Sequence, residues 1–135
     1  MREDEDIFKY RAALLVRSKT IDLSPIRDAL ELNPQPYWLA GDMMVRPTNK
    51  RSVREDNYSC FPFPIDPLLT LEENVGIYIT KLVPISLIID KILHDGGSAV
   101  VAISWYSGQG RGYEFHFSLL QKLAELRINL GVEVF

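Results

Sequence analysis

Two segments of the chain carry apolar residues at consecutive positions, and they constrain the fold more than any other feature. Residues 10–18 read YRAALLVRS, and residues 98–106 read SAVVAISWY. A strand with one face in water alternates apolar and polar residues, whereas a strand that is covered on both faces reads as a continuous apolar run. The two segments therefore predict strands in the interior of a sheet.

Caps and apolar spacing predict two helices in the first two thirds of the chain. The first is expected to have Ser24 as its N-cap and Pro25 at its first position, and to stop before Pro34. The second begins with a capping box of Thr70 and Glu73 and stops near residue 84, which is a proline.

Two further helices are predicted in the last third. One starts after Pro84 and closes at Gly96 or Gly97 in the left-handed conformation. The other opens with a capping box of Ser118 and Gln121.

Two hairpins and a closing strand complete the predicted sheet. Residues 42–46 and 58–61 flank a polar run and have the composition of edge strands, where proline is tolerated. Residues 113–117, YEFHF, alternate strictly and predict a half-buried partner for the 98–106 strand, and residues 131–135 form the last strand. The expected fold class is α+β, with a mixed, largely antiparallel sheet of five to six strands and helices packed mainly on one face.

Length and composition fit a single domain over residues 1–135. A chain of 135 residues with 47% hydrophobic and 24% charged residues has the usual size and composition of one globular domain. Residues 1–8 are expected to form a flexible acidic tail. Residues 33–67 hold six of the eight prolines, so they predict a loop and hairpin excursion.

Charge and cysteine content exclude several classes of partner. The formal net charge of -3 gives the chain no electrostatic reason to bind nucleic acid or anionic lipid. No apolar run reaches the roughly 18 to 20 residues that a membrane-spanning helix needs. The only cysteine is Cys60, which excludes an intrachain disulfide, and the acidic N-terminus has no apolar signal core. We therefore expect a cytoplasmic protein with no nucleic acid and no membrane partner.

Short signatures occur in order along nearly the whole chain. They are DLSP at residues 22–25, LNP at 32–34, GD at 41–42, LVP at 82–84 and LGVEV at 130–134. Together with the predicted order of elements, they resemble the mainly bacterial family known as domain of unknown function 4279. The resemblance implies a small cytoplasmic α+β domain and brings no reaction, cofactor or catalytic residue. Some members look like components of toxin and immunity gene neighbourhoods, which implies an interaction role.

No residue group predicts a catalytic or metal site. His116 and Glu114 can form an acid–base pair, but the same alternation is what a half-solvated strand requires, and we favour that structural interpretation. Cys60 is more often a small apolar filler than a nucleophile in such a context. His94 and His116 have no cysteine or carboxylate at ligand spacing, so we predict no metal and no cofactor. The glycine-rich residues 108–112 join two strands and do not open a helix, so a hairpin is favoured over a phosphate site.

Aromatic and charged residues in the proline-rich segment and at one strand end are the candidates for binding. They are Trp38, Asp42, Arg46, Arg51, Trp105 and Tyr106. Aromatic residues in loops are typical of recognition surfaces, and a basic cluster favours an anionic partner. The alternatives are that Trp38 covers the core as a lid and that the arginines lie in a solvated loop.

The leading interpretation is a non-catalytic protein-interaction or ligand-binding domain with its contact surface at residues 37–54. An immunity-like role is one version of it. The alternative is a small enzyme that acts on a metabolite with Asp42 and His116 as acid–base groups. The exposed edges of the sheet also allow a homodimer.

Overall fold

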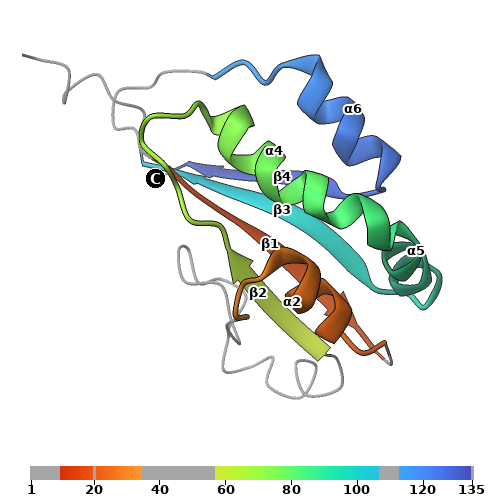
Figure 1. Ribbon diagram of the computed structural model, residues 1–135. Helices are drawn as coiled ribbons and strands as arrows, with labels where there is room; N and C mark the ends of the chain where they lie inside the picture. Colours follow the sequence, from red (N-terminus) through yellow and green to blue (C-terminus); the bar gives the residue numbers. More distant parts are fainter. Residues whose placement is uncertain (1–9, 20, 35–56, 107–112, 135) are drawn as a thin grey trace, which may run out of the picture.

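The computed structural model describes residues 10–19, 21–34, 57–106 and 113–134. In these ranges the strands form one sheet in the order β2-β1-β3-β4 (Figure 1). Strand β1 spans Tyr10–Ser18, β2 spans Asn57–Pro62, β3 spans Ser98–Trp105 and β4 spans Asn129–Val134. Strand β1 is antiparallel to β2 and β3, whereas β3 is parallel to β4. The α+β class and the mixed sheet are confirmed, and the described residues contain four strands where five to six were predicted.

The two segments with continuous apolar sequence are the inner strands, as predicted. Strand β1 has the predicted bounds, and β3 ends at Trp105. Leu14 and Val101 point to the main core and are at most 1% exposed. Ala13 on the opposite face of β1 is fully buried too, in a small cluster with Cys60. Burial on both faces explains why neither strand alternates.

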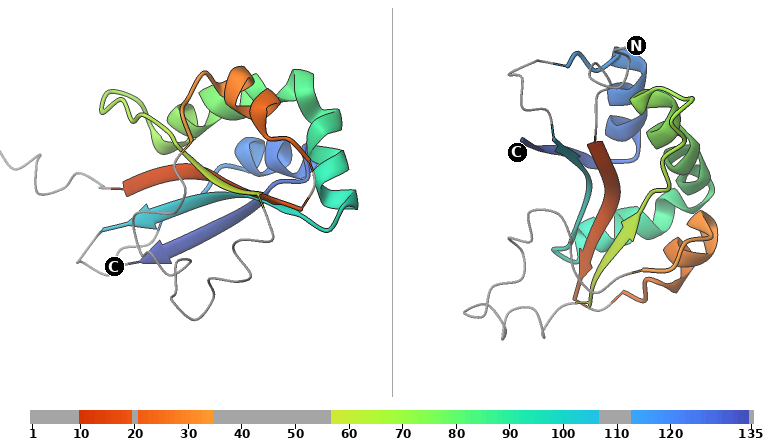
Figure 2. Two further views of the ribbon diagram at one scale, coloured as in Figure 1. Left: turned by 90° about the horizontal axis from the view of Figure 1, so that it is seen from below. Right: turned by 90° about the vertical axis from the view of Figure 1, so that its left-hand side faces the viewer.

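The helices all lie on one side of the sheet (Figure 2). Helix α2 spans Ser24–Leu30, α4 spans Leu71–Leu82, α5 spans Ser86–His94 and α6 spans Phe117–Glu125, with a short 3₁₀ helix η2 at Val83–Ile85 between α4 and α5. Their inward side chains form the main core against the sheet, with the largest contributions from Ile26, Leu30, Ile79, Leu82, Ile89, Ile92, Leu119 and Leu123. None of the helices in the described ranges is long and apolar enough to cross a membrane.

The capping box at the start of α4 is confirmed. The hydroxyl of Thr70 accepts a hydrogen bond from the Glu73 backbone N–H at 3.1 Å, and the Glu73 carboxylate accepts one from the Thr70 backbone N–H at 2.8 Å. The predicted closure of α5 at a glycine is also confirmed, because Gly96 has a φ of 86°.

The predicted start of the first helix is wrong. Ser24 lies inside α2, and the N-cap residue Leu23 has no side-chain cap. The carboxylate of Asp22 accepts the Ser24 backbone N–H at 3.0 Å, so the acceptor lies two residues earlier than expected. The helix ends at Leu30, where Glu31 takes the left-handed conformation, rather than being stopped by Pro34.

The predicted strand at residues 113–117 is also wrong. The segment pairs with no strand in the described part of the chain, and Phe117 already belongs to α6. The reason is that β3 has β1 and β4 as its two neighbours, which leaves it no free edge. The alternation still decides packing, since Tyr113 and Phe115 contact the main core while Glu114 is exposed.

One strand of the other predicted hairpin is confirmed. Residues 58–61 lie in β2, at one edge of the sheet. Its predicted partner, residues 42–46, lies outside the described residues.

Candidate functional site

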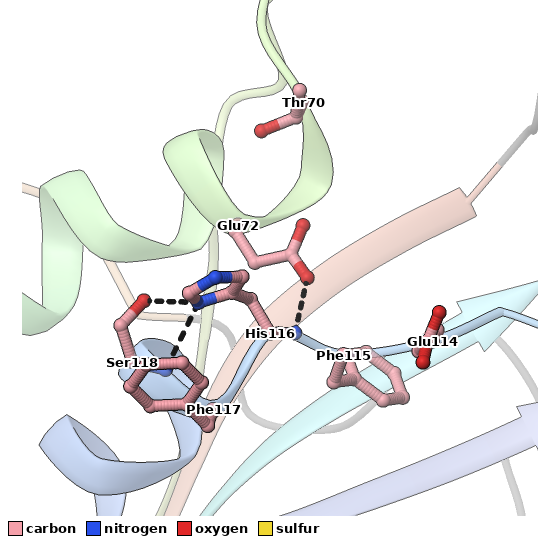
Figure 3. A pocket seen from close by; sticks show the side chains of 7 residues that line it. All are labelled: Thr70, Glu72, Glu114, Phe115, His116, Phe117 and Ser118. Atoms are coloured by element: carbon pink, nitrogen blue, oxygen red, sulfur yellow. Dashed lines mark hydrogen bonds between the residues drawn. The ribbon is translucent and has the colours of Figure 1, made fainter.

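A pocket of about 800 Å³ opens where the first turns of α4 and α6 meet (Figure 3). Core packing positions both walls, because Leu71 at the start of α4 and Leu119 in the first turn of α6 are buried. The pocket is lined by Thr70, Glu72, Glu114, Phe115, His116, Phe117 and Ser118.

Glu72 connects the two walls of the pocket. Its carboxylate accepts hydrogen bonds from the Tyr113 hydroxyl at 2.7 Å and from the His116 backbone N–H at 2.9 Å. Desolvation is the largest single influence on the carboxyl and raises its pKa, but these hydrogen bonds together outweigh it and hold the pKa below its usual value. Burial, and then the contact with Glu72, raise the pKa of the Tyr113 hydroxyl. The carboxylate also lies in the first turn of α4, where the helix dipole favours an anion.

His116 is the N-cap of α6. Its Nδ1 accepts a hydrogen bond from the Ser118 backbone N–H at 3.1 Å and lies 2.8 Å from the Ser118 hydroxyl. Because Nδ1 accepts, the neutral ring carries its proton on Nε2. The predicted cap at Ser118 is therefore wrong, since an imidazole nitrogen two residues earlier supplies the acceptor. The imidazole also stacks on Phe117 with ring centroids 4.5 Å apart, so its orientation is fixed (Figure 3).

The contact between His116 and Ser118 does not form a catalytic arrangement with Glu72. A nucleophile and a base act together when a third group orients the base. In Figure 3 the Glu72 carboxylate points to the backbone of His116 and not to the imidazole, and its oxygens accept from Tyr113 and that backbone N–H. The Nδ1 atom is engaged at the helix end. These contacts stabilise local structure and leave the outer surface of the pocket for binding.

The outer surface of the pocket is acidic and aromatic. Glu72 and Glu114 supply carboxylates, and no lysine or arginine is among the lining residues. The ring of Phe117 is 72% exposed, and Phe115 is held by an edge contact to Tyr113 with centroids 5.1 Å apart. Carboxylates beside an exposed aromatic ring attract cations by charge and by the ring quadrupole.

Four of the sequence-predicted binding residues lie outside the described residues: Trp38, Asp42, Arg46 and Arg51. Convergence of Asp42 with His116 therefore stays a prediction. Trp105 is only 7% exposed and packs edge-on to Tyr113, with centroids 6.4 Å apart. Tyr106 is 38% exposed, and the Arg11 guanidinium lies 5.9 Å from its ring centre.

Sequence reasoning missed Glu72 and assigned Phe117 to a buried face. Glu72 shows one local signal, its place next to a capping box, and its partners lie 41 and 44 residues away. Phe117 continues the alternation of Tyr113 and Phe115, but α6 begins there and the period changes from two to 3.6. Glu114 and His116, which the alternation placed together, do line the same pocket.

In the described part of the chain, no group of three or more histidine, cysteine, aspartate or glutamate side chains could hold a metal ion. Comparison with known proteins gave no match to a family model, to a curated protein or to a solved structure. The resemblance to domain of unknown function 4279 therefore stays a prediction.

Proposed function

We propose that this chain is a non-catalytic interaction domain whose pocket between α4 and α6 binds a lysine or arginine side chain of a partner protein. The observation that supports this most directly is the composition of the pocket, which combines Glu72, Glu114 and the exposed ring of Phe117 with no basic residue. An immunity-like role would be one form of such an interaction. Residues 37–54 remain a second predicted contact surface in this proposal.

The choice of a cation over an anion rests on the state of the two helix ends. A helix N-terminus attracts anions when its backbone N–H groups are free. At α4 the capping box of Thr70 and Glu73 and the carboxylate of Glu72 already satisfy this end, and at α6 the His116 imidazole accepts the Ser118 N–H. An anionic ligand would meet carboxylates instead of free donors.

The choice of a protein partner rests on exposed apolar surface beyond the pocket. Phe117 and Leu120 lie three residues apart in α6, so they are neighbours on the helix surface, and they are 72% and 42% exposed. A lysine or arginine side chain places its alkyl stem along such a surface while its charge reaches the carboxylates. A small polar metabolite would leave this apolar surface in water.

The proposal is tested by NMR titration of the ¹⁵N-labelled chain with N-acetyl-arginine amide and N-acetyl-lysine amide. We expect saturable shifts at the amides of Glu72, Glu114 and Phe117 in the millimolar range that suits a single side chain. N-acetyl-glutamate amide at the same concentrations serves as the probe of opposite charge and should cause no such shifts. Equal shifts with the glutamate probe, or none with either cationic probe, contradict the proposal.

Two variants locate the binding. Glu114→Gln removes a carboxylate and Phe117→Ala removes the ring, and each is expected to raise the dissociation constant by roughly three- to tenfold. Glu125→Gln and Val83→Ala change an exposed carboxylate and an exposed apolar residue away from the pocket lining, and they should bind like the unaltered chain. A loss of binding in these controls that equals the loss in the pocket variants contradicts the proposed site.

A further inference from the structure

We propose that two copies of this chain associate through the free edge of β4, with the two β4 strands antiparallel, so that both sheets continue into one. The proposal commits to a second copy of the chain as the occupant of that edge. It rests on β4 alone and does not depend on the function proposed for the pocket.

The first observation is that β4 is an unprotected edge strand. Among the described residues it pairs with β3 on one side and with no strand on the other. Free edges present unpaired backbone N–H and C=O groups, and proteins usually protect them with proline, lysine or inward charges. The sequence of β4 is NLGVEV, which has no proline, no lysine and one charged residue, Glu133. The opposite edge differs, because β2 ends at Pro62 and Pro64 follows it, and a proline has no N–H to donate.

The second observation is a row of apolar side chains along this edge. Leu130, Val132 and Val134 alternate along one face of β4, and Leu130 packs against the main core, so the row lies on the helix side of the sheet. Val132 is 46% exposed and Val134 is 65% exposed. Exposed β-branched residues on an open edge gain cross-strand contacts when another strand is added.

The third observation is that β4 is complementary to itself in one register. With a two-fold axis through Val132, this residue faces Val132 of the second copy, and Leu130 faces Val134 of the second copy. All three apolar residues of the row are then paired. On the other face Glu133 lies opposite Gly131 of the second copy, so no two carboxylates face each other.

The neighbouring registers are less favourable. An axis through Glu133 places two carboxylates directly opposite, which destabilises a strand pair. An axis through Gly131 leaves Val134, the most exposed residue of the row, without a partner in β4. The self-complementary register produces a closed two-fold dimer, the commonest symmetry of soluble oligomers. A pair of six-residue strands buries less area than a standard interface, so we expect a dissociation constant in the micromolar range.

Sedimentation equilibrium over low micromolar to millimolar concentration tests the association. We expect the mass to rise from that of the 15.4 kDa chain toward twice that value. Val132→Glu places two carboxylates at the two-fold axis and should raise the dissociation constant by at least about tenfold. Val83→Glu is the matched control, because Val83 is 56% exposed but lies in η2, and it should dimerise like the unaltered chain. A chain that stays monomeric throughout, or a dimer that Val132→Glu leaves intact, overturns the proposal.

Disulfide trapping tests the register without relying on a destabilising change. Residues opposite each other in antiparallel strands have Cα atoms about 4.5 to 5.5 Å apart, which lies within disulfide range. Val132→Cys should therefore form a covalent dimer on mild oxidation, whereas Val83→Cys should not. Glu133→Cys should form little, since its partner across the interface is Gly131. The native Cys60 is 1% exposed and does not compete. Trapping that is stronger at position 133 than at 132 overturns the register.

Discussion

Asn74 is a buried polar residue that joins three parts of the chain. Its Nδ2 donates to the Tyr10 hydroxyl at 2.8 Å and to the Asp66 carbonyl at 3.1 Å, and its Oδ1 accepts from the Asp66 backbone N–H at 3.0 Å. The side chain is 1% exposed, so water cannot replace these contacts. Asn74 thereby holds the loop before α4 against the start of β1, and it helps to position the α4 wall of the pocket.

Replacing Asn74 should measure the value of this contact set. Asn74→Ala leaves buried donors and acceptors without partners, and we expect the free energy of unfolding to fall by about 2 to 3 kcal/mol. Urea denaturation followed by circular dichroism gives this value. Gln121→Ala, at an exposed position of α6, should stay within about 0.5 kcal/mol of the unaltered chain. An Asn74→Ala loss as small as that of Gln121→Ala would show that the contacts contribute nothing.

Glu72 predicts how stability depends on pH. The pKa of its carboxyl in the folded chain lies below its usual value, so the unfolded chain takes up a proton first as the pH falls. The stabilising contribution is therefore present above the ordinary glutamate pKa of about 4.3 and is lost as the pH falls through the folded value. Glu72→Gln should be less stable than the unaltered chain at neutral pH, and the difference should shrink toward about pH 3.

Urea denaturation at a series of pH values measures that difference, with the exposed Glu125→Gln as control. The Glu125→Gln difference should show a weaker dependence on pH. A Glu72→Gln difference that is the same at every pH would contradict the role of the Tyr113 and His116 contacts.

At the scale of elements, local chemistry decided most boundaries correctly. The capping box of Thr70 and Glu73 and the left-handed Gly96 could be predicted because each acts on its own backbone neighbours. The starts of α2 and α6 could not, since Asp22 and His116 accept the N–H groups that Ser24 and Ser118 were expected to cap by themselves. Several nearby side chains can serve as the acceptor, and packing selects among them.

The link from α5 to β3 depends on the absence of a side chain at Gly97. A Cβ atom there would lie 2.2 Å from the Arg17 carbonyl oxygen, on β1, and 2.8 Å from Cγ2 of Ile92. Gly97→Ala should force α5 away from the sheet and lower the free energy of unfolding by about 2 kcal/mol or more. Gly76, inside α4, is the matched control, because a Cβ there meets nothing within 4 Å.

Gly76→Ala should raise the free energy of unfolding by roughly 0.5 to 1 kcal/mol, since alanine is the better helix former. Thermal or urea denaturation of the two variants side by side gives both values. Equal effects of the two substitutions would contradict the close approach of α5 to β1.

At the scale of the whole molecule, the strand order places Cys60 in a closed environment. The thiol packs with Ala13 on the face of the sheet away from the helices and is 1% exposed. Burial raises the pKa of the Cys60 thiol to about 11. The filler role that the sequence suggested for this residue agrees with its burial.

Thiol reactivity should therefore report the unfolding of the molecule. We expect Cys60 to react very slowly with Ellman's reagent at mildly alkaline pH, because little thiolate forms and the sulfur is shielded. The exposed Val83→Cys thiol should react at once under the same conditions, and Cys60 should react at that rate in urea. Rapid reaction of Cys60 without denaturant would contradict the packing of β2 against β1.

The sequence by itself determined β1, β3, the start of α4, the end of α5 and the α+β class. Each of these depends on residues that are neighbours in the chain, through period, cap or turn conformation. The tertiary structure decided which distant segments meet. The parallel pairing of β4 with β3 took the edge that residues 113–117 were expected to use, and it sent that segment over to Glu72 to form the pocket. A strand edge or a carboxylate accepts whichever partner packing brings to it, and no local pattern in the chain records that choice.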